Sequence, residues 1–218
     1  ETTQTSQSLY QALWNSADVL RSKKDANDYK SYLLGMVFYK YLPDKMLFFV
    51  AETMEEGTDS LEDALEVYRN YYEDADTHED LVSVMNDELN YIIKPDLTFT
   101  ALVARVNEGT FQLEDLAQGF RDIEQSDDLY ENLFEDIDLY SKKLGATPQK
   151  QNQTVAAVMK ELAVLDVAGH AGDMLGDAYE YLIGQFATDS GKKAGEFYTP
   201  QPVAKLMTQI AFLGREDQ

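Results

Sequence analysis

The sequence contains no cysteine, which excludes disulfide bonds and thiolate metal sites. It also has no apolar run approaching the roughly 18 residues that a membrane-spanning helix needs. The N-terminus lacks the basic start and apolar stretch of a secretory signal peptide. These absences predict a soluble, cytoplasmic protein with no membrane contact.

Basic residues are scarce, because 18 Lys and Arg stand against 40 Asp and Glu, which gives a formal net charge of −22. The imbalance is largest between Glu52 and Glu88, where fourteen carboxylates accompany a single basic residue, Arg69. Such a surface repels phosphate backbones, so most of the chain is not expected to bind DNA generally. A solvated acidic face on amphipathic helices is the simplest interpretation, and a basic partner protein is the alternative.

Recognisable catalytic motifs are also missing. There is no glycine-rich phosphate loop or nucleophile elbow, and no pair of carboxylates stands out from the acidic background. Two histidines are present, His78 in an acidic loop and His170 between glycines, and neither has the neighbours of a zinc ligand. The fourteen tyrosines are most simply core residues whose hydroxyls reach the surface. We therefore predict no metal site.

What the sequence does have is helical periodicity almost throughout, without clear β alternation, so we expect an all-α protein. Asp25 is expected to cap the second helix, and Pro43 to begin a third that ends near Gly57. The apolar faces expected on the first two helices are Leu9, Leu13, Ala17 and Leu20, then Tyr29, Leu33, Met36, Val37 and Tyr41.

Further along, Ser60 and Asp63 resemble a capping box, Asp96 is expected to cap the helix after Pro95, and Glu108-Gly109 forms a turn. Periodicity fades from 136 to 148, which predicts a loop or linker. Two more helices are expected, over 154–167 and 173–188. We divide the chain into a helical domain, residues 1–150, and a second element, residues 151–218.

The segment GEFYTPQPVAKLM, residues 195–207, has the pattern of a functional helix start. Thr199 is a good N-cap and Pro200 suits the first helical position. A helix N-terminus presents unpaired N–H groups that suit a carboxylate or phosphate, and Phe197 and Tyr198 could pack against a ring. On these residues alone, an ordinary capped helix with two aromatic anchors remains the simpler interpretation.

Three stretches resemble the methyltransferase (M) subunit of type I restriction-modification systems. DANDYKSYLLGMVFYKYLPDKM (25–46) is similar to its N-terminal helical signature, and LTFTALVARVNEGTFQLEDLAQGFRDIEQS (97–126) to a later part of that domain. LGDAYEYLIGQFATDSGKKAGEFYTPQPVAKLM (175–207) resembles the junction with the catalytic domain. The resemblance covers essentially the whole chain from Leu9 onward.

The resemblance implies an S-adenosylmethionine-dependent DNA adenine N6-methyltransferase with a Rossmann-like α/β catalytic domain. The expected partners are a specificity subunit, a second methyltransferase subunit, a motor-nuclease restriction subunit and double-stranded DNA held by the complex. The residues that would line the methionine end of the cofactor pocket are Glu196, Phe197, Tyr198, Thr199, Pro200 and Gln201.

The sequence also departs from this family. It lacks the glycine-rich loop after the first catalytic strand, and the Asn-Pro-Pro-aromatic motif is absent because Asn-Pro occurs nowhere. We therefore expect a truncated fragment: the helical domain plus the first helices of the methyltransferase domain, with its catalytic motif beyond Gln218 and no activity alone. The alternatives are a non-catalytic acidic module that docks a basic partner, and a helical scaffold without a ligand.

Overall fold

The computed structural model describes residues 2–21 and 26–165, together with positions 176, 178, 180 and 181. Within these residues the chain is helical and contains no strand, which confirms the all-α prediction. None of the helices in this part of the chain combines the length and apolarity that a membrane crossing requires. The helices are α1 (Thr2–Arg21), α2 (Ala26–Thr53), α3 (Leu61–Glu73), α4 (His78–Leu89), α5 (Phe99–Glu108), α6 (Leu113–Glu124) and α7 (Pro148–Ala163), with short 3-10 turns at Pro95–Leu97 and Asp128–Tyr130.

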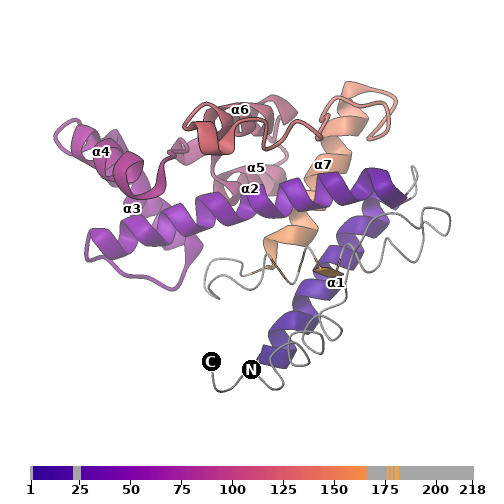
Figure 1. Ribbon diagram of the computed structural model, residues 1–218, viewed down its shortest axis with the longest axis horizontal. Helices are drawn as coiled ribbons and strands as arrows, with labels where there is room; N and C mark the ends of the chain where they lie inside the picture. The colour runs from indigo at the N-terminus through magenta and orange to yellow at the C-terminus, as the bar shows by residue number, and fades with distance from the viewer. Residues whose placement is uncertain (1, 22–25, 166–175, 177, 179, 182–218) are drawn as a thin grey trace, which may run out of the picture.

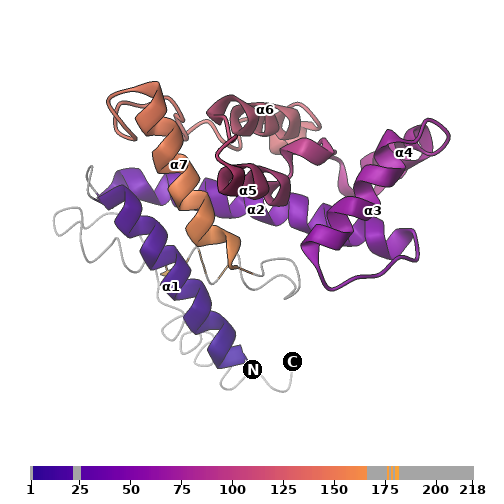
Figure 2. The same cartoon turned by 180° about the vertical axis from the view of Figure 1, so that it is seen from behind.

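The long helix α2 organises the others (Figures 1 and 2). The α3–α4 pair lies at one end of α2, and α1 and α7 lie at the other end, where they pack against each other. Helices α5 and α6 lie alongside the middle of α2, and α5 contacts α2, α3 and α7. Because α2 has neighbours on several sides, it is buried over more than one face.

The predicted apolar faces of the first two helices are largely confirmed. Leu13, Ala17 and Leu20 of α1 are buried, as are Leu33, Met36 and Val37 of α2, whereas Tyr41 is only half-buried. Fully buried Tyr39 and Lys40 were not part of the predicted face, because a single stripe cannot describe a helix covered on several sides. The side chains of Leu9 and Tyr29, and all of Asp25, lie outside the described residues.

The prediction that Pro43 begins a new helix is wrong, because α2 continues through it. An interior proline removes one helical hydrogen bond and costs about 3 kcal/mol against alanine. Tertiary packing offsets this cost here, since Leu42, Met46 and Leu47 on both sides of the proline are all buried. The Leu42 carbonyl also accepts a hydrogen bond from the Tyr91 hydroxyl at 2.8 Å.

The predicted cap at Ser60 and the predicted turn at Gly109 are both found. Ser60 caps α3, since its hydroxyl accepts from the Asp63 N–H at 3.3 Å. The Ser60 N–H, however, donates to the Thr58 hydroxyl at 3.1 Å. Thr58 therefore takes the acceptor role that the capping box assigns to Asp63. Gly109 ends α5 with a φ of 76°, as the expected turn requires.

Two helix starts were predicted wrongly. Thr98, not Asp96, caps α5, because its hydroxyl accepts from the Ala101 N–H at 3.3 Å, while Asp96 lies exposed in the preceding 3-10 turn. Helix α7 begins at Pro148 rather than Thr154, because Thr147 caps it, and it ends at Ala163. For the helix expected over 173–188, the four described positions are helical and Ala178 is buried.

The stretch from 136 to 147 is irregular, as predicted, but it is firmly attached to the core. Its residues Leu139 and Leu144 are buried. The Gln151 amide nitrogen lies 2.9, 3.3 and 3.1 Å from three carbonyl oxygens of this loop, those of residues 140, 141 and 145. The Thr154 hydroxyl donates to the Leu144 carbonyl at 2.7 Å. These bonds give the loop carbonyls partners that a regular helix would otherwise supply.

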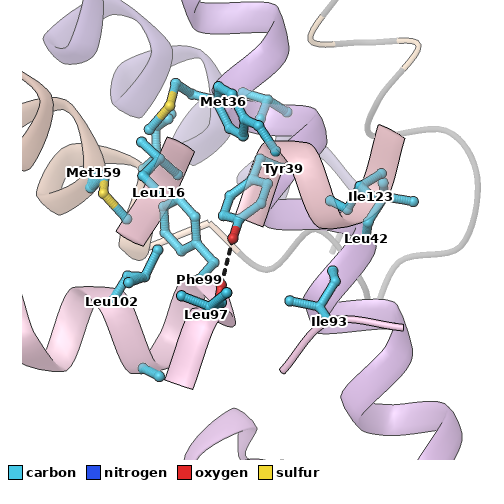
Figure 3. Packing of buried hydrophobic residues seen from close by; sticks show 14 of the residues in the cluster. Met36, Tyr39, Leu42, Ile93, Leu97, Phe99, Leu102, Leu116, Ile123 and Met159 are labelled. Atoms are coloured by element: carbon cyan, nitrogen blue, oxygen red, sulfur yellow. Dashed lines mark hydrogen bonds between the residues drawn. The ribbon is translucent and has the colours of Figure 1, made fainter. Parts of the chain in front are cut away.

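The expectation that tyrosine hydroxyls reach the surface is wrong for the most buried tyrosines, which donate to main-chain carbonyls instead. Tyr39 of α2 donates to Leu97 at 2.5 Å (Figure 3). Tyr68 of α3 donates to Ile93 at 2.8 Å, and Tyr91 donates back to α2. A polar group can be buried only when it has such a partner. The segment between α4 and α5 is therefore fastened to two helices.

The same burial changes the acidity of these side chains. Desolvation raises the pKa of Tyr39, Tyr68 and Tyr91 far above the ordinary value for tyrosine. Nearby acidic groups add to the effect at Tyr39, where Asp122 and Asp115 oppose a further negative charge. The folded protein therefore keeps these phenols neutral, and able to donate, well into the alkaline range.

We predict that Tyr39→Phe lowers the free energy of unfolding by about 1–3 kcal/mol, because the buried Leu97 carbonyl loses its donor. Tyr140→Phe is the matched control, since the Tyr140 side chain is half exposed and should change stability by less than about 0.5 kcal/mol. Urea unfolding followed by circular dichroism measures both. Equal effects in the two variants would contradict the role assigned to the buried hydroxyl.

We also predict a loss of stability at alkaline pH. The unfolded chain ionises its tyrosines near pH 10, whereas the raised pKa values of Tyr39, Tyr68 and Tyr91 keep them protonated in the folded state. Their contribution is thus complete below about pH 10 and falls as the pH rises above it. Urea midpoints should fall there, with tyrosinate absorbance from these groups appearing only on unfolding. Their ionisation near pH 10 with helicity intact would contradict this.

Candidate functional site

The predicted cofactor residues, Glu196 to Gln201, lie outside the described residues, as does His170. Their assignment to a cofactor pocket stays a prediction. The described part of the chain bears on it through one local feature, the only other Thr-Pro pair in the sequence, Thr147-Pro148.

Thr147 and Pro148 show what a Thr-Pro pair does at a helix start in this chain. Thr147 has extended backbone angles, φ −132° and ψ 154°, and its hydroxyl accepts from the Lys150 N–H at 3.3 Å. Pro148 occupies the first turn of α7, where its missing N–H costs nothing. The cap geometry expected for Thr199-Pro200 is thus found at Thr147-Pro148.

A groove of about 550 Å³ lies between α3 and α5, and Ala163 of α7 also lines it. We call it the α3–α5 groove. This volume lies within the range of roughly 300–1,000 Å³ that is typical of binding sites. Its walls include Leu61, Leu65 and Asn70 from α3, and Phe99, Val103 and Asn107 from α5.

Lys40, which lines this groove, belongs to a buried ion pair. Lys40 is 1% exposed, and its Nζ lies 2.6 Å from Asp44 Oδ2, one helical turn away across Pro43. The same Nζ lies 5.1 Å from the centre of the Phe99 ring, where a cation meets the electron-rich face. Because Asp44 neutralises the ammonium, Lys40 is not a free cation that could hold an anionic ligand.

The rim of the α3–α5 groove carries charge of both signs, but only the cation is compensated. Arg69 Nη2 lies 2.8 Å from Asp96 Oδ1. Glu62 and Glu66 are exposed on α3 and form no ion pair with any described residue. The groove therefore presents two uncompensated carboxylates to solvent.

His78 begins helix α4 rather than lying in a loop, and it has a structural partner. Its Nδ1 lies 2.6 Å from the Tyr72 carbonyl oxygen, and its ring meets the Tyr72 ring edge-on at 4.6 Å. Among the residues that the structure describes, no three His, Asp or Glu side chains are grouped so as to hold a metal ion.

Comparison with known families accounts for both parts of the chain. Residues 9–162 match the family described as "HsdM N-terminal domain", and residues 170–218 match "N-6 DNA Methylase". The chain belongs to the HsdM N-terminal domain family. It is part of a type I restriction-modification methyltransferase subunit, as the sequence motifs predicted.

Individual relatives agree with this assignment. The methylase subunit of the type I restriction enzyme MpnII from Mycoplasma pneumoniae is 28% identical over 94% of this chain and 39% of its own length. That of MjaIX from Methanocaldococcus jannaschii is 25% identical over 91% of this chain and 34% of its own. The crystal structure of a type I methyltransferase subunit from Streptococcus thermophilus is 89% identical, with a TM-score of 0.90, over 98% of this chain and 45% of that one. The chain thus spans less than half of each relative.

We predict that Lys40→Met destabilises the protein by about 3–5 kcal/mol, because it removes the cation that lies 2.6 Å from the buried Asp44 carboxylate. The double variant Lys40→Met/Asp44→Leu should recover at least half of that loss, since apolar replacement of a buried pair is often nearly neutral. Urea unfolding of Lys40→Met, Asp44→Leu and the double variant completes a double-mutant cycle. Additive losses would show that the two side chains do not act as a pair.

Proposed function

We propose that this chain is the N-terminal part of a DNA adenine N6-methyltransferase subunit that uses S-adenosylmethionine. The match of residues 170–218 to the N-6 DNA Methylase family supports this proposal most directly. The chain would act within a longer protein, since it spans only 39% of the Mycoplasma pneumoniae relative. We expect no methylation by these 218 residues alone, because they contain no Asn-Pro-Pro-aromatic motif.

The segment 196–201 is proposed to form one edge of the cofactor pocket. N–H groups at the start of the helix after Thr199 would receive the methionine carboxylate, because helix N-termini attract anions. Phe197 and Tyr198 would shield the apolar part of the cofactor. Support from the described residues comes from Thr147-Pro148, another Thr-Pro pair, which begins helix α7 with a Thr cap.

The chemistry follows from the nature of the substrates. Bound S-adenosylmethionine supplies a methyl group activated by its sulfonium. The target adenine would leave the duplex, and its N6 would accept this methyl group and lose a proton. Holding two reactants in line lowers the barrier to their reaction, and the role proposed for residues 196–201 is this positioning.

The helical domain, residues 1–150, is proposed to serve assembly, and residues 151–218 to lead into the catalytic domain. Its partners would be a specificity subunit, a second methyltransferase subunit and a motor-nuclease restriction subunit, with double-stranded DNA held by the complex. The net charge of −22 supports a division in which other chains provide most of the DNA contact.

We predict that Thr199→Val in the full-length subunit raises the dissociation constant for S-adenosylmethionine by about tenfold or more. Loss of the cap should cost about 1 kcal/mol of local helix stability. Misplaced N–H groups should weaken the hydrogen bonds to the carboxylate further, since such bonds contribute roughly 1.5–3 kcal/mol. Calorimetric titration measures the affinity, and DNA binding by the assembled complex should change little.

Thr147→Val is the matched control, because it removes the same type of cap from α7. It should lower stability by about 1 kcal/mol and leave cofactor affinity unchanged. If both variants lower stability and neither changes cofactor affinity, Thr199 caps an ordinary helix and the site assignment fails.

A further inference from the structure

We propose that the α3–α5 groove binds a basic amphipathic helix of a partner protein. This proposal goes beyond the methyltransferase function and does not depend on it, because the side chains that it invokes lie between residues 40 and 104. Its basis is the shape of the groove, the polarity of its two walls and the charge on its rim.

The shape suits a helix. Helices α3 and α5 are neighbours, and the hollow of about 550 Å³ lies between them, with exposed Glu62, Glu66 and Ala104 among its lining residues. Amphipathic helices commonly bind in such grooves, with apolar side chains one turn apart as anchors. Half-buried Leu61 and Val103 and exposed Ala104 provide apolar surface that such anchors would cover.

The charge of the groove selects a basic occupant. Glu62 and Glu66 lie one helical turn apart on α3 and form no ion pair with other described residues. The cations of the groove are occupied, Lys40 by Asp44 and Arg69 by Asp96. Lysine or arginine residues at the same spacing on a bound helix would supply the missing charge and set its orientation.

Other occupants fit less well. DNA is disfavoured by the carboxylates of the rim and by the wider acidic stretch between residues 52 and 88. A second copy of this chain would bring another net charge of −22 to the same surface. The occupant that the groove favours is therefore a different polypeptide, with an apolar stripe flanked by basic residues.

Two synthetic helical peptides of about 18 residues test the proposal directly. Both carry leucine at positions i, i+4, i+7 and i+11; one has flanking lysines and the other flanking glutamates. Fluorescence anisotropy with the full chain, near physiological salt, should give a micromolar dissociation constant for the lysine peptide and affinity at least about tenfold weaker for the glutamate peptide. Absence of binding by the lysine peptide would overturn the proposal.

Two pairs of variants then locate the binding. Glu66→Lys, in the groove, should weaken binding of the lysine peptide about tenfold. Glu88→Lys makes the same change of charge at an exposed position of α4 outside the groove, and should weaken binding less than about twofold. Ala104→Phe should weaken peptide binding by filling the groove without changing its charge. Ser83→Phe, at an exposed position of α4, is the control and should leave peptide binding unchanged. Equal effects within either pair would show general attraction or stickiness and overturn the proposal.

Discussion

The structure depends on tyrosine hydroxyls that are buried and must find an acceptor. Tyr39 and Tyr68 reach from α2 and α3 to carbonyls of the irregular segment 90–98, and Tyr91 within that segment donates to α2. Each bond satisfies a polar group that burial would otherwise penalise. Gly119 of α6 makes room for this arrangement, since a Cβ there would overlap the Tyr39 hydroxyl. The segment between α4 and α5 thus becomes part of the core (Figure 3).

Fixing this segment also determines where the helices after it lie. The 3-10 turn Pro95–Leu97 contacts α3, α5 and α6, and Thr98 immediately caps α5. The direction of α5 beside α3 follows, and with it the hollow between them. Lys40, whose charge Asp44 neutralises, lines that hollow together with Glu62 and Glu66. The chemistry of the groove is therefore a consequence of the core.

Local features of the fold could be predicted from the sequence, and features that depend on distant contacts could not. Periodicity located α1, and the Ser60 cap and Gly109 turn follow from neighbouring residues. Pro43 was misjudged because its cost is offset by packing elsewhere, and the buried tyrosine bonds join residues 25 to 58 positions apart. The start of α7 could have been found, since Thr147-Pro148 has the pattern used at Thr199-Pro200. The proposed cofactor site rests on family resemblance, whereas the groove could be found only once α3 and α5 were placed side by side.

The central claim is that cofactor contact and partner contact occupy different parts of this chain. Hydrogen–deuterium exchange of the full-length subunit, with and without S-adenosylmethionine, tests it most directly. The account predicts slower exchange on cofactor binding in the peptide covering 195–207 and unchanged exchange across α3 and α5. Protection within the α3–α5 groove, or none at 195–207, would contradict it.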